Sequence, residues 1–378
     1  MDQNTIIYQG GRALRRGWTT GTCAAAAAQA AAQMLLTGVV PPAVRLTTPA
    51  GLTFTLPVDA AHWETDAAVC AVRKYAGDDP DVTDGIRIFA AVCRTEKGIV
   101  IQGGAGIGVV TMPGLSVPVG EPAINPGPQR QITDAVMQVC RAAAYTGGLI
   151  ITLSAEHGEE IAQQTYNAHL GIVGGISILG TSGVVEPMSE KALADTIRLE
   201  LDCRYAQGQR VAFLCPGNYG ADFARNALGL DLEKAVKCSN YVGEALDHAA
   251  CRGFTEILLI GHAGKLVKIA AGVMNTHSAV ADGRKEIFTA YAALCGAEHE
   301  LLEALMQAIS VDACVALLDR AGLRQPVLDR IGTAVSRRLA QRLRGQVQAE
   351  FIMFTGQYGV LAQSPGARKL CERLKGSI

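Results

Sequence analysis

The sequence predicts an α/β protein in two parts. The first is an α+β domain with a long alanine-rich helix, and the second is a doubly wound, Rossmann-like parallel sheet with a helical C-terminal part. Three observations predict this. An alanine-rich run spans residues 23–36. From residue 149 onward, short apolar runs alternate with helical patterns. Glycine-rich loops follow several of these runs, as they do in ligand-binding α/β folds.

The composition favours a large, ordered protein without nucleic-acid or membrane partners. Hydrophobic residues make up 49% of the 378 and charged residues 18%, which is enough for an extensive core in two domains, or one large one. The formal net charge of −1 leaves no basic footprint for nucleic acid. No apolar stretch reaches the roughly 20 residues of a membrane-spanning helix, and no signal peptide is visible.

The 11 cysteines are scattered singly through apolar runs, with no CxxC pair and no Cys/His spacing suited to zinc. This dispersal predicts reduced, buried thiols in a cytoplasmic protein, without a protein-bound metal. Because the net charge is near zero, an anionic ligand would have to be held by local positive groups and helix N-termini.

A first domain is predicted over residues 1–146. Alanine is the strongest helix former, so residues 23–36 should form a helix that Gly38 and the following prolines end. Its small side chains favour close packing against another element. The other expected elements are a hairpin, a second β-rich stretch, a long ordered Gly/Pro segment and an amphipathic helix, at residues 44–58, 67–101, 103–128 and 129–144.

A second domain is predicted over residues 147–378, where strands and helices alternate. The expected strands are residues 149–153, 176–179, 211–215, 236–239 and 257–260. The expected helices cover residues 157–169 and 190–206, a segment ending near 228, and residues 241–252 and 266–274. A helical region at 285–344, a late strand at the sheet edge at 346–354 and a final short helix from 367 complete the chain.

Glycine loops end three of the predicted strands, at residues 180–183, 217–220 and 261–264. The carboxyl ends of parallel strands lie along one edge of a sheet, and ligands bind there. We therefore expect the three loops to build a single cleft.

The stretch from Glu256 to Arg284 contains more polar chemistry than a packing element needs. His262 lies in a glycine loop just after a strand, so ligand contact is favoured over a core histidine bonded to the backbone. His277 follows the predicted helix, where it could instead interact with the helix dipole. Lys265 begins that helix, the wrong end for a cation, and therefore needs an anionic partner. Lys268 is three residues on and can face the same way.

Two loops of the first domain carry further candidates. Hydroxyls and backbone N–H groups at a helix N-terminus form a natural anion site. The candidates there are Arg15, Arg16, Thr19, Thr20 and Thr22. Four aspartates crowd the loop GDDPDVTDG, either as a solvated turn or as groups that recognise a ligand or cation. They are Asp78, Asp79, Asp81 and Asp84.

Five stretches together resemble the cobalt-precorrin-5B C(1)-methyltransferases, the CbiD proteins of anaerobic cobalamin synthesis. They are LRRGWTTGTCAAAAA at 14–28, DPDVTDG at 79–85, GGAGIGVVTMPGLSVPVGEPAINPGP at 103–128, ILGTSGVVEPMS at 178–189 and GHAGKLVKIAAGVMNTHSAVADGR at 261–284. They run through about three quarters of the chain and are unlike common motifs. The segment after about residue 285 adds little to the resemblance.

The resemblance implies S-adenosylmethionine as methyl donor and a corrinoid substrate, cobalt-precorrin-5B, methylated at carbon 1 to give cobalt-precorrin-6A. The cobalt arrives inside the substrate. The substrate's carboxylates would be held by Arg15, Arg16, Thr19, Thr20, Thr22, Lys265 and Lys268. The donor would contact Gly180, Thr181, Ser182, Gly217, Asn218 and Gly220. The acid that usually binds the ribose in such folds is not identifiable from the sequence, and Glu186 is only a guess. If a proton must leave the macrocycle, His262 is the first candidate acceptor and His277 the second. A homo-oligomer is possible.

Two other functions are open on the residues alone. The run TTGTCAAAAAQAA is similar to the loop and helix of small-molecule kinases, which predicts ATP and Mg²⁺ binding with Asp81 or Asp84 on the metal, although no P-loop lysine signature is present. The second is a non-catalytic corrinoid carrier. Donor binding separates the three, because a carrier need not bind S-adenosylmethionine and a kinase should bind ATP.

Overall fold

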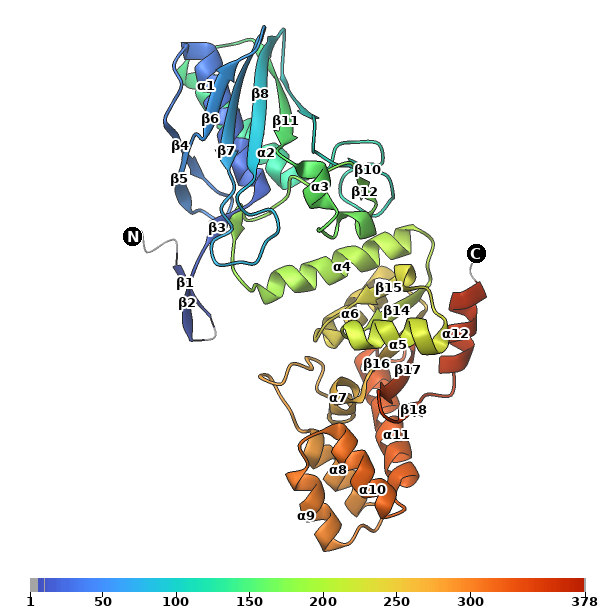
Figure 1. Cartoon of the computed structure of the whole chain (residues 1–378). Coiled ribbons are helices and arrows are strands. Elements are labelled where there is room, and N and C mark those ends of the chain that lie inside the picture. Colours follow the sequence, from blue (N-terminus) through green and yellow to red (C-terminus); the bar gives the residue numbers. More distant parts are fainter. Residues whose placement is uncertain (1–5, 10, 377–378) are drawn as a thin grey trace. The chain divides into compact units, whose positions relative to one another are not determined.

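The computed structural model describes residues 6–9 and 11–376. The chain divides into two compact units, one up to Ser189 and the other from Glu190 onward, and both combine helices with sheets that contain parallel strands (Figure 1). The predicted mixed α/β class is therefore confirmed. Within the described residues no helix is long and apolar enough to cross a membrane.

The first unit is built on a five-stranded sheet of order β6-β7-β8-β11-β9. Its strands are Ala60–Trp63, Ala67–Arg73, Arg87–Thr95, Gly148–Ala155 and Ile99–Gly103 in that order. Only the β11–β9 pair is parallel. Helices α1 (Thr20–Thr37) and α2 (Pro126–Ala142) pack on each other and share a core with the sheet (Figure 1).

Helix α1 confirms the packing predicted from its alanines. Ala24 to Ala28 and Ala30 to Ala32 are all fully buried. The helix begins at the N-cap Thr19, which accepts a hydrogen bond from Thr22 N–H, and ends at Gly38 in the left-handed conformation. A sheet on one side and α2 on the other leave room for little more than a methyl group.

Shorter elements complete the first unit. The predicted hairpin is confirmed as β4 (Ala43–Thr47) and β5 (Thr53–Pro57). The remaining strands pair as β1–β2, β3–β13 and β10–β12, at Ile6–Gln9 with Arg12–Arg15, Gly17–Trp18 with Val184–Val185, and Val109–Val110 with Ile172–Val173. In place of the single predicted helix 157–169 there are α3 (Gly158–Ala162) and the 3₁₀ turn η2 (Asn167–Leu170).

The predicted boundary at residue 146/147 is wrong. Strand β11 follows that point, yet it lies between β8 and β9 in the first unit's sheet. The predicted strand 176–179 forms only isolated bridges, Ile107 with Ile176 and Ile124 with Ile178, and these also belong to the first unit. The first unit extends to Ser189 because β11, β12 (Ile172–Val173) and β13 (Val184–Val185) all pair with strands that precede residue 146.

The second unit has the predicted parallel sheet, in the order β15-β14-β16-β17-β18. Its strands are Ala235–Lys237, Val211–Cys215, Glu256–His262, Gln348–Thr355 and Gly359–Gln363. The first four run parallel and β18 pairs antiparallel with β17. The late strand predicted at the edge is therefore interior, because the unpredicted β18 covers it.

Both faces of this sheet are covered, as successive side chains of β14 show. Ala212 and Leu214 belong to a core with α4 (Glu190–Ala206), α6 (Val242–Arg252) and the C-terminal helices. Phe213 and Cys215 face the opposite core, with α5 (Asn218–Leu228) and α12 (Ala367–Gly376). The C-terminal helices are α8 to α11, at Arg284–Ala293, His299–Gln307, Val311–Arg320 and Arg324–Arg342. A 3₁₀ turn, η3 (Leu232–Lys234), precedes β15.

The connections out of β14 and β15 run in opposite directions across this sheet. The chain goes from β14 through α5 to β15 on one side, then through α6 to β16 on the other side of β14. Such a reversal is a topological switch point, and the crevice outside the strand ends there is the general ligand site of open α/β sheets. The two loops that border it follow β14 and β16.

Candidate functional site at the switch point

Two of the three predicted glycine loops meet at the switch point. A Cβ built on Gly261 would lie 3.1 Å from Pro216 Cγ, and one built on Gly220 would lie 2.7 Å from Ile260 O. The absence of side chains at these glycines therefore allows α5 and the loop before it to contact the end of β16 directly. This contact confirms that the loops after β14 and β16 share one edge of the sheet.

The third loop, residues 180–183, is not part of this edge. It lies in the first unit, where a Cβ on Gly180 would overlap Thr19 and one on Gly183 would lie 2.8 Å from Thr48 Cβ. Thr181 and Ser182 are exposed, and Ser182 Oγ donates to Val184 O. The prediction of one cleft at a single sheet edge from all three loops is therefore wrong, because the segment before residue 180 is not a strand of the parallel sheet.

Gly217 has a backbone conformation that only glycine adopts readily. It is the N-cap of α5, with φ 98° and ψ 176°. A Cβ at this position would lie 3.3 Å from Lys265 Nζ. Asn218 is the first residue of α5. The loop thus keeps its backbone free of side-chain bulk at the start of a helix and next to an ammonium group.

His262 ends β16 and is the N-cap of the short helix α7 (Ala263–Leu266). Its Nδ1 accepts a hydrogen bond from the Gly264 N–H at 3.1 Å. The edge of its ring faces Phe354, and Tyr219, whose side chain is 79% exposed, lies with its ring centroid 6.1 Å away. Burial lowers the pKa of His262, which the charge of Asp312 partly opposes. The ring is therefore neutral near pH 7.

This arrangement changes the role expected of His262. A neutral imidazole has one donor and one acceptor nitrogen. Because Nδ1 is the acceptor for Gly264, the hydrogen is assigned to Nε2. His277 is arranged in the same way, since its Nδ1 accepts from the Ala279 N–H at 3.1 Å. In both rings Nδ1 is already occupied as an acceptor, so Nε2 is the nitrogen that remains to offer a ligand.

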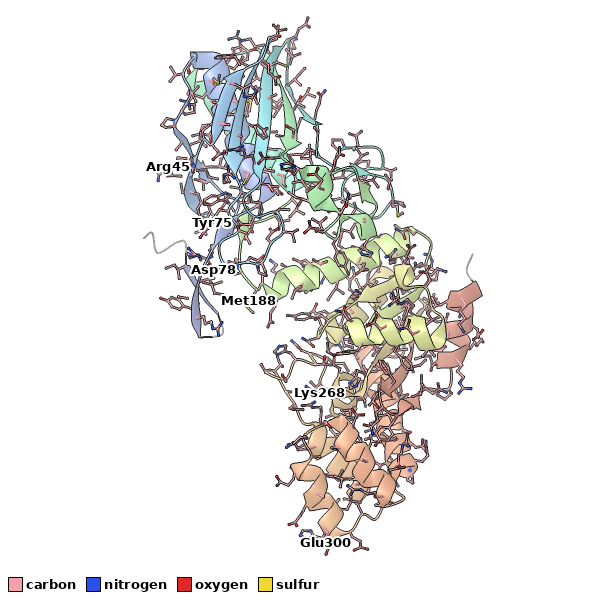
Figure 2. The ribbon with its side chains drawn as sticks, in the orientation of Figure 1. Arg45, Tyr75, Asp78, Met188, Lys268 and Glu300 are labelled. Carbon is pink, nitrogen blue, oxygen red and sulfur yellow. The ribbon has the colours of Figure 1, made fainter. Side chains whose placement is uncertain are left out.

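Lys268 is buried inside the second unit and holds a loop in place. The residue is 2% exposed, and Nζ donates to Thr276 O at 3.0 Å and to Ala281 O at 2.9 Å (Figure 2). Burial lowers its pKa, against the charge of Asp282. The predicted helix 266–274 is instead α7 followed by the 3₁₀ turn η4 (Val267–Ala271). Lys268 therefore fixes the loop that carries His277 and is not placed to bind a substrate carboxylate.

Lys268→Met is expected to lower the free energy of unfolding by about 1–3 kcal/mol, because two backbone carbonyls lose a charged donor. Amide exchange in residues 276–281 should also become faster. Denaturant unfolding and hydrogen exchange measure the two effects. Lys369→Met, at an exposed lysine of α12, is the control. Equal stability of the two variants would contradict the role given to Lys268.

Lys265 lies among three strand ends. Its Nζ donates to Ser239 O at 3.2 Å, and Ser239 follows β15. Tyr219 and this Ser239 contact were not predicted from the sequence. Tyr219 could have been noticed as an aromatic residue directly after Gly217 and Asn218. Ser239 could have been noticed because it follows the neighbouring parallel strand.

The threonines at the N-terminus of α1 bind the protein's own loop. Thr19, Thr20 and Thr22 are all buried. Thr20 Oγ1 donates to Ser177 O at 3.0 Å and accepts from Leu179 N–H at 3.0 Å, and Thr22 Oγ1 donates to Gly183 O at 2.7 Å. The expectation that these hydroxyls hold an anionic ligand is therefore not met, because Thr20 and Thr22 satisfy the backbone of residues 177–183 and Thr19 accepts from the Thr22 N–H.

Thr20→Val is expected to lower the free energy of unfolding by about 2–4 kcal/mol. The substitution conserves shape but leaves the Leu179 N–H and the Ser177 carbonyl without the hydroxyl. Thr20→Ser keeps the hydroxyl and should stay within about 1 kcal/mol of the wild type, since it loses one methyl group. Chemical denaturation compares the three proteins, and an unfolding midpoint for the valine variant equal to that of the serine variant would refute the structural role.

The two arginines before this helix are both paired. Arg15 Nη2 lies 2.6 Å from Asp78 Oδ1, and Arg16 Nη2 lies 3.2 Å from Glu186 Oε1 (Figure 2 labels Asp78). The Arg15 side chain nevertheless stays 62% exposed. Glu186 belongs to the first unit and binds Arg16, so it does not lie at the end of a strand of the parallel sheet, where a ribose-binding acid is expected.

The aspartate loop is held by internal contacts. Asp81 Oδ2 lies 2.6 Å from the ammonium of the buried Lys74, and Asp81 Oδ1 accepts from Thr83. Asp84 accepts from the Ala76 N–H at 2.7 Å. Burial opposes ionisation of Asp81, but Lys74 and Thr83 hold its pKa below the ordinary value. Both carboxylates proposed for a kinase metal thus already serve as structural acceptors.

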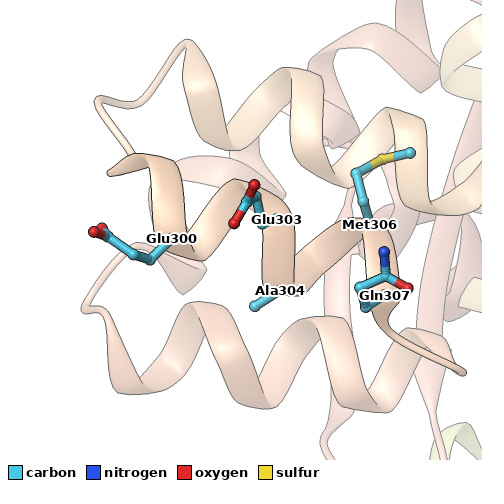
Figure 3. Close-up of a pocket in the computed structure, with 5 residues that line it drawn as sticks. All are labelled: Glu300, Glu303, Ala304, Met306 and Gln307. Atoms are coloured by element: carbon cyan, nitrogen blue, oxygen red, sulfur yellow. The ribbon is translucent and has the colours of Figure 1, made fainter.

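Two surface cavities lie away from the Gly217 and His262 loops. One, of about 470 Å³, is lined by five residues of α9 and its surroundings, Glu300, Glu303, Ala304, Met306 and Gln307 (Figure 3). The other, of about 450 Å³, lies at the starts of α4 and α6 beside Asn275. Arg198 and Arg342 in the second are paired with Glu244 and Asp247 at 2.6 Å. We assign no function to either cavity.

The parallel sheet with its topological switch point is typical of α/β proteins that bind ligands at the ends of their strands. Residues 7–187 match the family CbiD, and residues 275–365 match the family described as CbiD, C-terminal domain. This chain belongs to the CbiD family, as the sequence resemblance predicted.

Relatives cover nearly the whole chain. A cobalt-precorrin-5B C(1)-methyltransferase from Ruminiclostridium cellulolyticum is 49% identical over 93% of this chain and 91% of its own length. One from Alkaliphilus metalliredigens is 41% identical over 98% and 97%. A crystal structure of the cobalamin biosynthesis protein CbiD from Archaeoglobus fulgidus is 33% identical and covers 75% of this chain and 88% of that one, with a TM-score of 0.41.

Proposed function

We propose that this protein uses S-adenosylmethionine to methylate carbon 1 of cobalt-precorrin-5B, giving cobalt-precorrin-6A in the anaerobic cobalamin pathway. The observation that carries the proposal is the 49% identity, over 93% of the chain, to a relative named for that reaction. The topological switch point supports it, since the strand ends there are where this class of fold binds a ligand. The scattered cysteines suit a cytoplasmic location for the reaction.

The residues at the crevice fit the donor. Gly217 leaves the first turn of α5 without a side chain, and Asn218 and Gly220 follow it on the same helix. The exposed ring of Tyr219 offers an aromatic face for the adenine. When bound, the sulfonium supplies the methyl group as an electrophile. The loop residues Gly180, Thr181 and Ser182 are not retained as donor contacts, because this loop does not follow a strand of the parallel sheet.

The chain's own groups act by positioning. Methyl transfer from a sulfonium is an in-line displacement, so orientation of the two reactants supplies most of the rate. His262 contributes its Nε2–H as a hydrogen-bond donor to the substrate, with Nδ1 held by Gly264. His277 offers a second donor of the same kind. The exposed guanidinium of Arg15 is a candidate to bind a substrate carboxylate, which would compete with Asp78 for it. Arg16 is a second candidate, and there the substrate carboxylate would compete with Glu186.

Calorimetric titration of the purified protein with S-adenosylhomocysteine and with ATP tests this function. We expect one equivalent of S-adenosylhomocysteine to bind and ATP to give no heat of binding. Binding of ATP alone would instead support the phosphotransferase. The titrations would be repeated in the presence of a cobalt corrinoid that carries free carboxylates. If neither ligand bound under either condition, the result would favour a non-catalytic corrinoid carrier over a methyltransferase.

A further inference from the structure

The ammonium of Lys265 lies where three loops of the second unit come together. Nζ donates to Ser239 O, in the loop after β15, at 3.2 Å. It would lie 3.3 Å from a Cβ on Gly217, in the loop after β14. Lys265 itself belongs to α7, directly after β16. A single cation thus lies beside the ends of the three strands that form the switch point.

This ammonium has more donors than partners. It has three N–H donors. In the described part of the chain it has one acceptor, Ser239 O, and no carboxylate lies within ion-pair distance. The side chain is half-buried, and burial lowers its pKa. By contrast, Lys268 satisfies its ammonium with two carbonyls. The remaining N–H groups of Lys265 are therefore available for an anionic ligand in the crevice.

The position of Lys265 favours the donor over the substrate as the source of that anion. A Cβ on Gly217 would lie 3.3 Å from Nζ, so the missing side chain of this glycine leaves the space beside Nζ open. That same glycine loop is the proposed donor contact, and the amino-acid end of S-adenosylmethionine carries a carboxylate. The proposed function assigns the substrate's carboxylates to Arg15 and Arg16 instead.

We infer that Lys265 binds the α-carboxylate of the methyl donor through Nζ, at the junction of the loops after β14, β15 and β16. This assignment rests on the proposed function. It replaces the expectation that Lys265 binds the substrate. Bound there, the carboxylate also lies near the first turn of α5, whose N–H groups carry the positive end of the helix dipole.

Two ligands that differ in the amino-acid end test the inference. S-adenosylhomocysteine has the carboxylate, and 5′-methylthioadenosine lacks it. Lys265→Met removes the ammonium, and Lys265→Gln removes the charge while keeping an N–H donor for Ser239 O. We expect both variants to bind S-adenosylhomocysteine about 10- to 100-fold more weakly than the wild type. Their affinity for 5′-methylthioadenosine should stay within about twofold, as should both affinities of the control Lys369→Met.

The other outcomes overturn the assignment in distinguishable ways. An equal loss of affinity for both ligands would mean that Lys265 only supports the structure of the loops. Loss in the methionine variant but not in the glutamine variant would mean that the Ser239 contact is what matters. Unchanged binding of both ligands would leave the carboxylate elsewhere. If the wild type binds neither ligand, alone or with a carboxylate-bearing cobalt corrinoid, the proposed function fails and this assignment fails with it.

Discussion

Gly217→Ala is expected to weaken binding of S-adenosylhomocysteine by at least about tenfold. The backbone at Gly217 has φ 98° and ψ 176°, a region that costs other residues about 1–3 kcal/mol. Alanine would therefore favour loop conformations that do not bind the donor, and each 1.4 kcal/mol of this cost corresponds to about a tenfold loss of affinity. The new Cβ would also lie 3.3 Å from Lys265 Nζ, in the space assigned to the donor. Calorimetry measures the affinity.

Gly229→Ala is the matched control for this substitution. Gly229 caps the other end of α5 with φ 65°, and the nearest atom to its Cβ would be Lys375 Cε at 3.9 Å. It should therefore cost a similar amount of stability, about 1 kcal/mol, without changing donor affinity. If the two variants bind S-adenosylhomocysteine equally well, the donor does not lie against the loop after β14.

His262→Asn is expected to lower kcat/KM for methyl transfer by about 10- to 100-fold, since the shorter asparagine amide does not place a donor at the position of the imidazole Nε2–H. Asparagine is a favoured N-cap, so its side-chain oxygen can accept from the Gly264 N–H as Nδ1 does. Folding should then be preserved. His262→Ala, which removes both the donor and the cap, should lose activity and also about 1 kcal/mol of stability. Full activity of the asparagine variant would mean that His262 only caps helix α7 and does not contact the substrate.

The pH dependence of stability provides an independent check on His262. Burial lowers its pKa in the folded state, so the unfolded chain binds this proton more readily. Stability should therefore fall as pH decreases from about 6.5, the ordinary histidine value, toward the lower folded-state pKa, and then level off. Protonation would also place a hydrogen on Nδ1 and break the Gly264 contact. His262→Asn should flatten this part of the curve, and an unchanged slope would contradict the assignment.

The second unit was largely predictable from its sequence pattern. Helix α4 (Glu190–Ala206) and strand β14 (Val211–Cys215) have the predicted bounds. Strand β14 is a continuous apolar run, and polar residues with glycine separate it clearly from α4. The contact between the loops after β14 and β16 also followed, because strand–helix alternation fixes which strand ends share an edge.

The first unit shows why the rest could not be predicted. The apolar run of β11 has the same pattern whether its partners are parallel or antiparallel, and those partners, β8 and β9, are distant in the sequence. The glycine loop that begins at Gly180 resembles a ligand-binding loop. The missing side chain of Gly180 instead makes room for Thr19 of the same unit.

The sequence also did not show which of the candidate site residues are enclosed by the fold. Lys268 lies one turn after Lys265 with the same chemistry, yet its ammonium is enclosed by two carbonyls, while that of Lys265 has one. Which nitrogen of His262 is free depends on the Gly264 contact, which only the folded loop creates.

The most direct test of the central claim is methyl transfer itself. Purified protein would be incubated with cobalt-precorrin-5B and S-adenosylmethionine labelled with ¹³C in its methyl group, and the product examined by NMR. We expect one labelled methyl group on carbon 1 of the macrocycle and an equal amount of S-adenosylhomocysteine. Recovery of unmethylated substrate from a protein that binds both ligands, or a label at another ring carbon, would contradict the claim.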